Sequence, residues 1–294
     1  MDLADEDVKI GIVGKYTGSL DTYLSVVKAL IHSCVEVCRR LDITWIESEQ
    51  LEEEYKEKDP EKFTAAWSLL GEQDGILIPG GFGDRGVMGK AAAAGFCRRN
   101  KKPFLGVCLG MQVAVIDFAQ NVLGWKDANS EEFNPDCDRK VVVFMPETRE
   151  EVNMGGTMRL GLRTTLIQEG DCMARRLYGG SEAVERHRHR YEVNPDVVDE
   201  LAKHGMIFTG KDETGRRMEI LEIPDHPFFI AAQSHPEFTS RPSRPNPCFL
   251  GFVLASCGEL SKRFKKYGDR LRPGAGLLDL CQNEENAISS AHSV

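Results

Sequence analysis

A cysteine at a strand-to-helix junction is the residue in this sequence that is best placed to do chemistry. Cys108 lies in the stretch FLGVCLGMQVAV (104–115), with Gly106 two residues before it and Gly110 two residues after it. This spacing fits the nucleophile elbow G-x-nucleophile-x-G, with cysteine in place of serine. The sharp turn strains the central residue, and flanking glycines let neighbouring segments approach closely. We therefore predict that Cys108 is a nucleophile; a small apolar residue at a strand end is the weaker alternative.

The elbow also predicts the surroundings of the thiol. We expect the sulfur to be exposed at the carboxyl end of the sheet, where ligands of open α/β sheets bind. It would face a helix N-terminus, whose unpaired N–H groups favour the thiolate. An attacked carbonyl needs donors for its oxyanion, and the backbone N–H of Leu109 is one of them. The glycine-rich stretch PGGFGDRG (79–86) follows another strand, and we choose Gly81 there as the second donor.

A base for this nucleophile is predicted in the stretch QSHPEF (233–238). His235 and Glu237 are two residues apart at the end of an apolar strand, so both side chains of an extended chain point to one face. Pro236 cannot donate to a sheet ladder and would hold the segment out of regular pairing. Glu237 would then hold one imidazole nitrogen while the other faces Cys108. A surface turn at a strand end explains the spacing equally well, and both interpretations stay open.

The arginine-rich stretch ERHRHRYEVNP (185–195) has several interpretations. If it is extended, its three central arginines share one face, and His187 and His189 share the other. A nucleic-acid-binding stripe is disfavoured, because the chain is acidic and no aromatic stacking residues lie nearby. A metal site at the two histidines lacks further ligands at suitable spacing, so we expect no metal. We favour an arginine set for a substrate carboxylate or for contacts within the domain.

Composition and charge exclude several classes of protein. The 294 residues include 46 acidic and 37 basic ones, which gives a net charge of -9 and argues against general nucleic-acid binding. The hydrophobic content of 41% supports a full core. No run approaches the ~18 apolar residues of a membrane span, and the acidic start MDLADEDVKI lacks an apolar signal region. The nine cysteines are widely spaced and indicate reduced thiols, so we expect a cytoplasmic protein without membrane contact.

The elements that must position these residues follow from the hydrophobic periodicity. Up to residue 125 we expect strands over 9–14, 43–48 and 103–107 and a strand followed by a loop over 75–81, alternating with helices over 21–40, 59–70, 88–100 and 109–124. Such alternation implies a parallel sheet covered on both faces. Later segments are strand-like over 141–145, 158–167, 206–210, 218–223 and 228–234, and helix-like over 195–205 and 248–268.

These elements predict an α/β fold. We expect a doubly wound, mostly parallel sheet flanked by helices, to which the second half of the chain adds antiparallel strands. One domain would cover residues 1–268. The remainder, 269–294, is polar and lacks a period or a helical cap, so we expect a disordered tail.

Together these pieces resemble class I (triad) glutamine amidotransferase domains. That family has a cysteine elbow of the form G-x-C-x-G-x-Q and a late H-x-E, which stand here as GVCLGMQ (106–112) and HPE (235–237). PGGFGDRG, NSEEF, GGTMRLG (155–161), ERHRHRYEVNP and HPEFTSRP make the chain similar, from about residue 8 to 260, to the glutaminase half of CTP synthases. The resemblance implies the fold of that family and hydrolysis of L-glutamine to glutamate and ammonia through a cysteine thioester.

The resemblance implies a role for each matched residue. Cys108 is the nucleophile, His235 is general base and acid, and Glu237 orients the imidazole. Gly81 and Leu109 form the oxyanion hole. The implied substrate-binding residues are Gly81, Leu109, Gly110, Met111, Gln112, Glu132 and Arg190. A carboxylate and a guanidinium are the counter-charges expected for the two α-groups of glutamine. Phe82 and Arg85 would lie near the path of GTP and ammonia, and GGTMRLG would be a lid over the glutamine site.

The resemblance also implies what would complete the activity. CTP synthases use ATP, Mg and UTP in an N-terminal synthetase half, which we expect to be absent here, because no phosphate-loop spacing occurs and the first amidotransferase strand begins at residue 9. The implied partners are L-glutamine and that synthetase domain, with GTP as allosteric activator, no cofactor for glutamine hydrolysis, and a homo-tetramer for the full enzyme. Two alternatives are a free-standing γ-glutamyl hydrolase of the same fold and a silent regulatory module.

Overall fold

A nine-stranded sheet forms the centre of the described part of the chain, which comprises residues 6–15, 20–145 and 158–276 of this computed structural model. The strand order is β2-β1-β3-β4-β12-β11-β10-β7-β8. The first five strands run parallel: β2 (Arg40–Glu47), β1 (Asp7–Gly14), β3 (Gly75–Ile78), β4 (Phe104–Val107) and β12 (Phe229–Ala232). The last four pair antiparallel: β11 (Met218–Glu222), β10 (Ile207–Lys211), β7 (Arg159–Ile167) and β8 (Glu182–His189).

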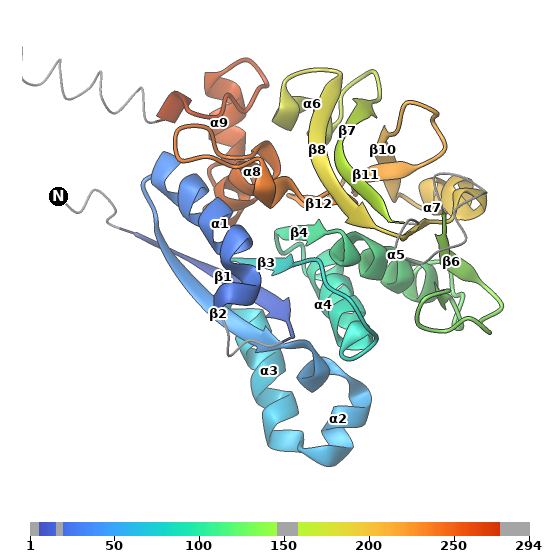
Figure 1. Cartoon of the computed structure of the whole chain (residues 1–294). Helices are drawn as coiled ribbons and strands as arrows, with labels where there is room; N and C mark the ends of the chain where they lie inside the picture. The colour runs from blue at the N-terminus through green and yellow to red at the C-terminus, as the bar shows by residue number, and fades with distance from the viewer. Residues whose placement is uncertain (1–5, 16–19, 146–157, 277–294) are drawn as a thin grey trace, which may run out of the picture.

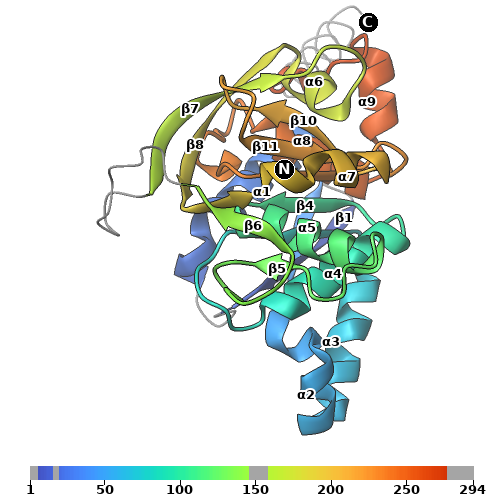
Figure 2. The ribbon, with the colours of Figure 1, turned by 90° about the vertical axis from the view of Figure 1, so that its right-hand side faces the viewer.

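Helices cover both faces of the parallel half (Figures 1 and 2). One face carries α1 (Leu24–Glu36) and α8 (Pro247–Ser256), and the other carries α3 (Pro60–Glu72), α4 (Val87–Arg99) and α5 (Leu109–Asn121). Each layer has its own hydrophobic core against the sheet, because the buried residues divide into two clusters that follow the two sets of helices. The predicted doubly wound α/β fold with added antiparallel strands is therefore confirmed.

Smaller elements complete the fold. A separate three-stranded sheet consists of β5 (Asn129–Ser130), β6 (Lys140–Phe144) and β9 (Tyr191–Val193). The short helices are α2 (Glu53–Lys58), α6 (Met173–Tyr178), α7 (Val198–Lys203) and α9 (Leu260–Lys266), together with the 3₁₀ turns η1 (Leu20–Tyr23), η2 (Ser48–Leu51), η3 (Pro195–Val197) and η4 (Pro236–Phe238). Of the described helices, none is both long and apolar enough to cross a bilayer.

Local chemistry explains where the central elements begin. Strands β3, β4 and β12 are buried at every residue, as expected for parallel strands covered on both faces, so they are short continuous apolar runs. Helix α3 begins after Asp59, whose side chain accepts a hydrogen bond from the backbone N–H of Lys62, with Pro60 in the first turn. Both signals are local in sequence, which is why these elements are predictable.

Two predictions about the later part of the chain are wrong. The single helix expected over 248–268 is two helices, α8 and α9, because Gly258 adopts a left-handed φ of 71° between them. Residues 269–276, expected in the tail, pack on the domain: Leu271 is fully buried, and the backbone N–H of Gly276 donates to the Glu36 carboxylate at 2.7 Å. The rest of the expected tail, 277–294, lies outside the described residues.

Candidate active site

Three adjacent parallel strands deliver the predicted catalytic segments to one edge of the sheet. The loop 79–83 leaves β3, Cys108 follows β4, and His235 lies just beyond β12. Strand β4 is the middle strand of the three, since Gly106 pairs with Ile78 on one side and Val107 with Ala232 on the other. The carboxyl ends of these strands meet at the same edge, so the cysteine lies between the histidine and the loop 79–83. This loop carries the predicted donor Gly81 and is called the oxyanion loop below.

The backbone at Cys108 has the geometry of a nucleophile elbow. Its φ of 51° and ψ of -101° are unfavourable for a residue with a side chain and mark local strain. A side chain at Gly110 would overlap the carbonyl oxygen of Ile78, and one at Gly106 would lie 2.8 Å from the backbone of Gly110. The Cys108 N–H donates to Ala232 O at 2.7 Å, which ties the turn to β12. The glycine bracket is therefore required by close packing.

The expectation of an exposed sulfur is wrong. Cys108 is only 6% exposed, because β8 passes over it and the carbonyl oxygen of Arg188 lies 4.0 Å from its Sγ. The side-chain amide of Gln233 donates to Sγ at 3.6 Å, and Gln112 donates to Gln233 Oε1 at 3.3 Å and to Tyr191 O at 2.8 Å. Gln233 was missed by sequence reasoning; its only signal is a polar residue at the end of an otherwise apolar strand.

His235 and Glu237 form a buried pair, which rules out a surface turn. His235 Nδ1 lies 2.8 Å from Glu237 Oε1, and both side chains are largely buried. Burial by itself lowers the pKa of His235, but the nearby Cys108 sulfur and the Glu237 carboxylate raise that pKa to about 10. The opposite nitrogen, Nε2, is buried and has no hydrogen-bond partner among the described residues. Because Glu237 occupies Nδ1, Nε2 is the nitrogen that is available to the Cys108 sulfur.

Gly80 separates the nucleophile from the base. A Cβ at this position would lie 2.8 Å from His235 Cε1 and 3.4 Å from Cys108 Cβ. A Cβ at Gly81 would make only ordinary contacts, 3.6 Å from Lys90 Nζ and 3.7 Å from Leu109 Cδ2. The structure therefore brings Gly81 and Leu109, the two predicted oxyanion donors, next to each other beside the thiol.

Lys15 binds the backbone of the oxyanion loop through its ammonium. Its Nζ donates to Gly83 O at 2.8 Å and to Phe82 O at 3.3 Å, although Lys15 itself directly follows β1. Burial lowers the pKa of Lys15, and Asp84 opposes this shift. The sequence shows no phosphate-loop spacing around Lys15, and no role was predicted for this residue. Its only sequence signal is a lysine directly after a buried strand.

Glu132 and Arg190, the predicted counter-charges for glutamine, lie close to each other in space. Burial raises the pKa of Glu132, and the neighbouring charges of Arg190 and Lys15 oppose that shift. Met111, another predicted substrate-binding residue, has its side chain fully buried in the core. Only its backbone N–H, which donates to Cys108 O at 3.0 Å, faces the elbow. Gly110 likewise serves packing against Ile78.

Phe82 and Arg85, the two residues expected near a GTP and ammonia path, lie at the protein surface in the segment that follows β3. Phe82 is 56% exposed, and the guanidinium of Arg188 lies 5.5 Å from its ring centroid. Arg85 is half-exposed and pairs with Glu49 at 3.8 Å. The expected lid, 155–161, lies partly outside the described residues, which resume at residue 158.

Comparison with known proteins agrees with this geometry. The model of the family "Glutamine amidotransferase class-I" matches residues 19–255. The chain belongs to this family. It is 51% identical over 95% of its length to CTP synthase 1-B of Xenopus laevis and 55% identical over 87% to CTP synthase 1 of Saccharomyces cerevisiae. These matches cover 47% and 45% of the two relatives, so the chain spans about half the length of the curated relatives it matches.

A solved structure of the same family is also similar. The glutaminase domain of Trypanosoma brucei CTPS with bound acivicin superposes with a TM-score of 0.77 at 43% identity, covering 86% of this chain and 94% of that one. The fold of the amidotransferase described here is therefore that of a CTP synthase glutaminase domain.

The two histidines of β8 are buried and lie against each other. Burial alternates along β8 as predicted, with the arginines outward and the histidines inward. His187 Nδ1 lies 2.9 Å from His189 Nε2, and burial together with Arg159 lowers the pKa of His187 to about 3. Within the described ranges, no group of three or more His, Cys, Asp or Glu side chains has the geometry of a metal site.

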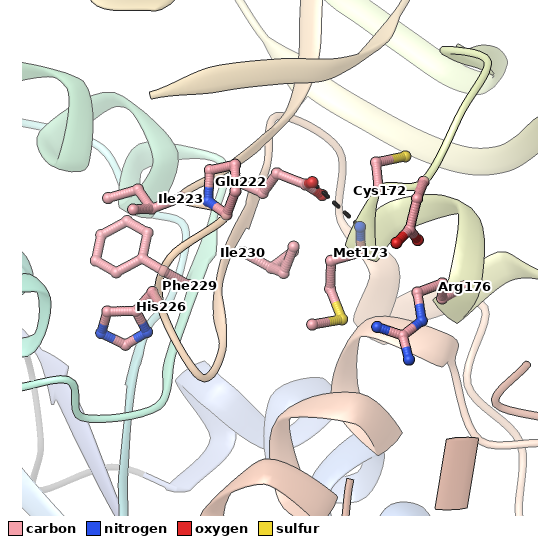
Figure 3. Close-up of a pocket in the computed structure, with 10 residues that line it drawn as sticks. Cys172, Met173, Arg176, Glu222, Ile223, His226, Phe229 and Ile230 are labelled. Carbon is pink, nitrogen blue, oxygen red and sulfur yellow. Dashed lines mark hydrogen bonds between the residues drawn. The ribbon is translucent and has the colours of Figure 1, made fainter. Parts of the chain in front are cut away.

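The amidotransferase has two cavities of interest, and only one of them lies at the catalytic edge. That cavity, of about 500 Å³, is lined by Gly80, Gly81, Lys90, His235 and Glu237 among others. The other, of about 140 Å³, lies at the opposite edge, where Phe229 begins β12 (Figure 3). Of its two carboxylates, Asp171 and Glu222, the latter accepts the backbone N–H groups of Met173 and Ala174 at the start of α6. That carboxylate is therefore occupied by a structural role.

Proposed function

We propose that this chain hydrolyses L-glutamine to glutamate and ammonia through a thioester on Cys108. One observation carries the proposal: a strained cysteine after β4 and a buried His235–Glu237 pair after the adjacent strand β12 lie at the same edge of the sheet. Gly81 of the neighbouring loop lies beside Leu109 at the start of α5, and we assign their two backbone N–H groups to the oxyanion.

The first half of the reaction forms the thioester. The Cys108 thiolate attacks the side-chain carbonyl carbon of glutamine, a C–S bond forms, and the carbonyl electron pair moves to oxygen, where the Gly81 and Leu109 N–H groups stabilise it. The His235 imidazolium then gives its Nε2 proton to the departing nitrogen as the C–N bond breaks. Ammonia leaves and the thioester remains.

The second half returns the enzyme to its starting state. His235, now neutral, takes a proton from water, and the resulting hydroxide equivalent attacks the thioester through the same oxyanion geometry. The C–S bond breaks, the thiolate regains its charge, and glutamate leaves. Glu237 keeps the imidazole in one orientation throughout, because it holds Nδ1 at 2.8 Å.

Substrate recognition is assigned to the opposite charges at the far end of the site. Glu132 would pair with the α-ammonium of glutamine and Arg190 with its α-carboxylate, which is the arrangement expected for an amino acid zwitterion. The Gln112 amide donates to the carbonyl of Tyr191, the neighbour of Arg190, and to Gln233, which in turn donates to the Cys108 sulfur. We therefore assign Gln112 to the positioning of the middle of the substrate.

The names of the relatives extend the proposal to a larger reaction. We propose that the ammonia passes to a synthetase partner domain that uses ATP, Mg and UTP to make CTP in the cytoplasm, in a homo-tetrameric enzyme. GTP would act as an activator at the exposed Phe82 and Arg85 rim. Support for this comes from the 51% and 55% identity to CTP synthases, of which the chain spans about half.

Glutamate release from L-glutamine tests the proposed hydrolysis. The full chain should release glutamate and ammonia in equal amounts, and Cys108→Ala should release neither. Cleavage of γ-glutamyl peptides in preference to glutamine would favour a free-standing γ-glutamyl hydrolase, and no turnover of either substrate would favour a silent module. CTP should not form from ATP, UTP, Mg and free ammonia with this chain alone; its formation would refute the need for a partner.

A further inference from the structure

The buried ammonium of Lys90, next to the oxyanion loop, takes no part in the thioester mechanism proposed above. Lys90 is only 1% exposed and lies in the first turn of α4, yet it is one of the largest fully buried side chains of the described residues. Its Nζ would lie 3.6 Å from a Cβ at Gly81, so the charge is in contact distance of the loop that carries an oxyanion donor. It also lines the 500 Å³ cavity next to His235 and Glu237.

The environment of Lys90 offers it no permanent counter-charge. Throughout the described ranges, no hydrogen bond or ion pair of its ammonium is found. Burying an uncompensated charge is costly, and accordingly burial lowers the pKa of Lys90 to about 7, with Lys15 lowering it further and Cys108 raising it. Lys15 differs, because it faces the carboxylates of Asp84 and Glu132 and two loop carbonyls. The anion that Lys90 faces is the one that forms at Cys108.

We propose that Lys90 is a positioning cation of the amidotransferase reaction, whose ammonium stabilises the Cys108 thiolate and the oxyanion held by Gly81. The inference rests on the proposed hydrolysis of glutamine. The Lys90 ammonium lies beside the loop and not among the reacting atoms, so it acts by electrostatics across Gly81 and exchanges no proton or bond with the substrate. A purely structural lysine, which only fills space under the loop, is the opposing interpretation.

The test compares Lys90→Met with Lys90→Arg and with Lys102→Met. Lys102 supplies a matched control, since it is a half-buried lysine whose Nζ donates to Gly71 O at 3.0 Å at the other edge of the sheet. The first readout is the rate of Cys108 alkylation by iodoacetamide as a function of pH, followed on the Cys108 peptide by mass spectrometry without glutamine. The second is kcat and KM for glutamine.

Loss of the cation should affect the thiolate and not substrate binding. A nearby opposite charge shifts a titration by about one to three units, so in Lys90→Met the midpoint of the alkylation profile should rise by about one pH unit and alkylation at pH 7 should fall about tenfold. We expect kcat to fall about tenfold, KM to stay within twofold, and Lys90→Arg to retain most of both rates. Lys102→Met should change neither.

Several outcomes would overturn the inference. An unchanged alkylation profile and kcat in folded Lys90→Met would do so, as would equal losses in the Met and Arg variants, which indicate a packing role. If Lys90→Met does not fold, Lys90→Arg decides: arginine stays charged above neutral pH, so the alkaline decline of kcat must move to higher pH. An unmoved decline contradicts the proposal. If glutamine is not a substrate at all, the pH profile of Cys108 alkylation still reports on Lys90. The failure of the proposed glutamine hydrolysis is thereby distinguished from the failure of the Lys90 proposal.

Discussion

Replacing Gly80 by alanine should disable the site while leaving the domain folded. The new Cβ would lie 2.8 Å from His235 Cε1, so the ring or the loop must move by at least about 0.6 Å to reach the 3.4 Å of ordinary van der Waals contact. The ring cannot yield freely, because Glu237 holds its Nδ1 at 2.8 Å. Overpacking of this kind costs about 1–3 kcal/mol of stability.

The kinetic cost should exceed the cost in stability. A misplacement of about 1 Å reduces the rate about 100-fold, so we expect kcat of Gly80→Ala to fall between about tenfold and about 100-fold. Gly81→Ala is the matched control, because its Cβ meets only atoms at 3.6 Å and 3.7 Å and its backbone N–H remains. Steady-state glutamate release gives kcat and KM, and thermal unfolding gives stability. Gly80→Ala with kcat within twofold of the parent, or equal losses in both variants, would refute the reasoning.

Further predictions concern labelling, binding and pH. A glutamine-like electrophile such as a diazoketone should modify the chain once, at Cys108, and labelling that survives Cys108→Ala would count against the nucleophile. Glu132→Ala and Arg190→Ala should each weaken glutamine binding by about 2 kcal/mol or more, a rise in KM of at least about 30-fold, with little change in thermal unfolding; an unchanged KM in both would contradict the assignment. Burial raises the pKa of Glu185 to about 7, so the folded state holds a proton that the unfolded state loses near its ordinary pKa of 4.5. Its contribution to stability is then present below pH 4.5 and lost as the pH rises through 7, and Glu185→Gln should flatten this loss in urea titrations at pH 5 and 8. The pKa of His187 is lowered to about 3, so its effect on the free energy of unfolding has the opposite sign. The stability that is present above pH 6.5 should be lost as the pH falls toward 3, and urea titrations in that pH range should show a smaller loss for His187→Gln.

The elbow was predictable because its constraints are local. A strained cysteine needs small neighbours on both sides, and the sequence shows Gly106 and Gly110 at the required spacing. The spacing of His235 and Glu237 was equally compatible with a surface turn. Only the position of β12 beside β4 buries that segment and directs it toward the thiol.

The features that sequence reasoning missed depend on contacts between distant segments. The sulfur is covered because β8 crosses the site, and nothing near Cys108 in the sequence indicates this. Lys15 reaches the oxyanion loop from just beyond β1 and so belongs to no motif with the glycines. Lys90 is only nine residues beyond Gly81, in the helix that follows the loop, but nothing in the sequence indicates that its side chain is buried beside that loop. Helix propensity likewise did not show the interruption at Gly258, which divides an apolar periodic run.

The order of strands in the sheet also sets when the site can exist during protein synthesis. Strand β4 with the elbow is made before β12, its neighbour in the sheet, and β12 follows only after the small sheet and the whole antiparallel half have been made. Until then the nascent chain has a cysteine without a base and a turn without its hydrogen bond to Ala232. We therefore expect a chain that ends before β12 to release no ammonia from glutamine, because its cysteine would lack the base that β12 positions.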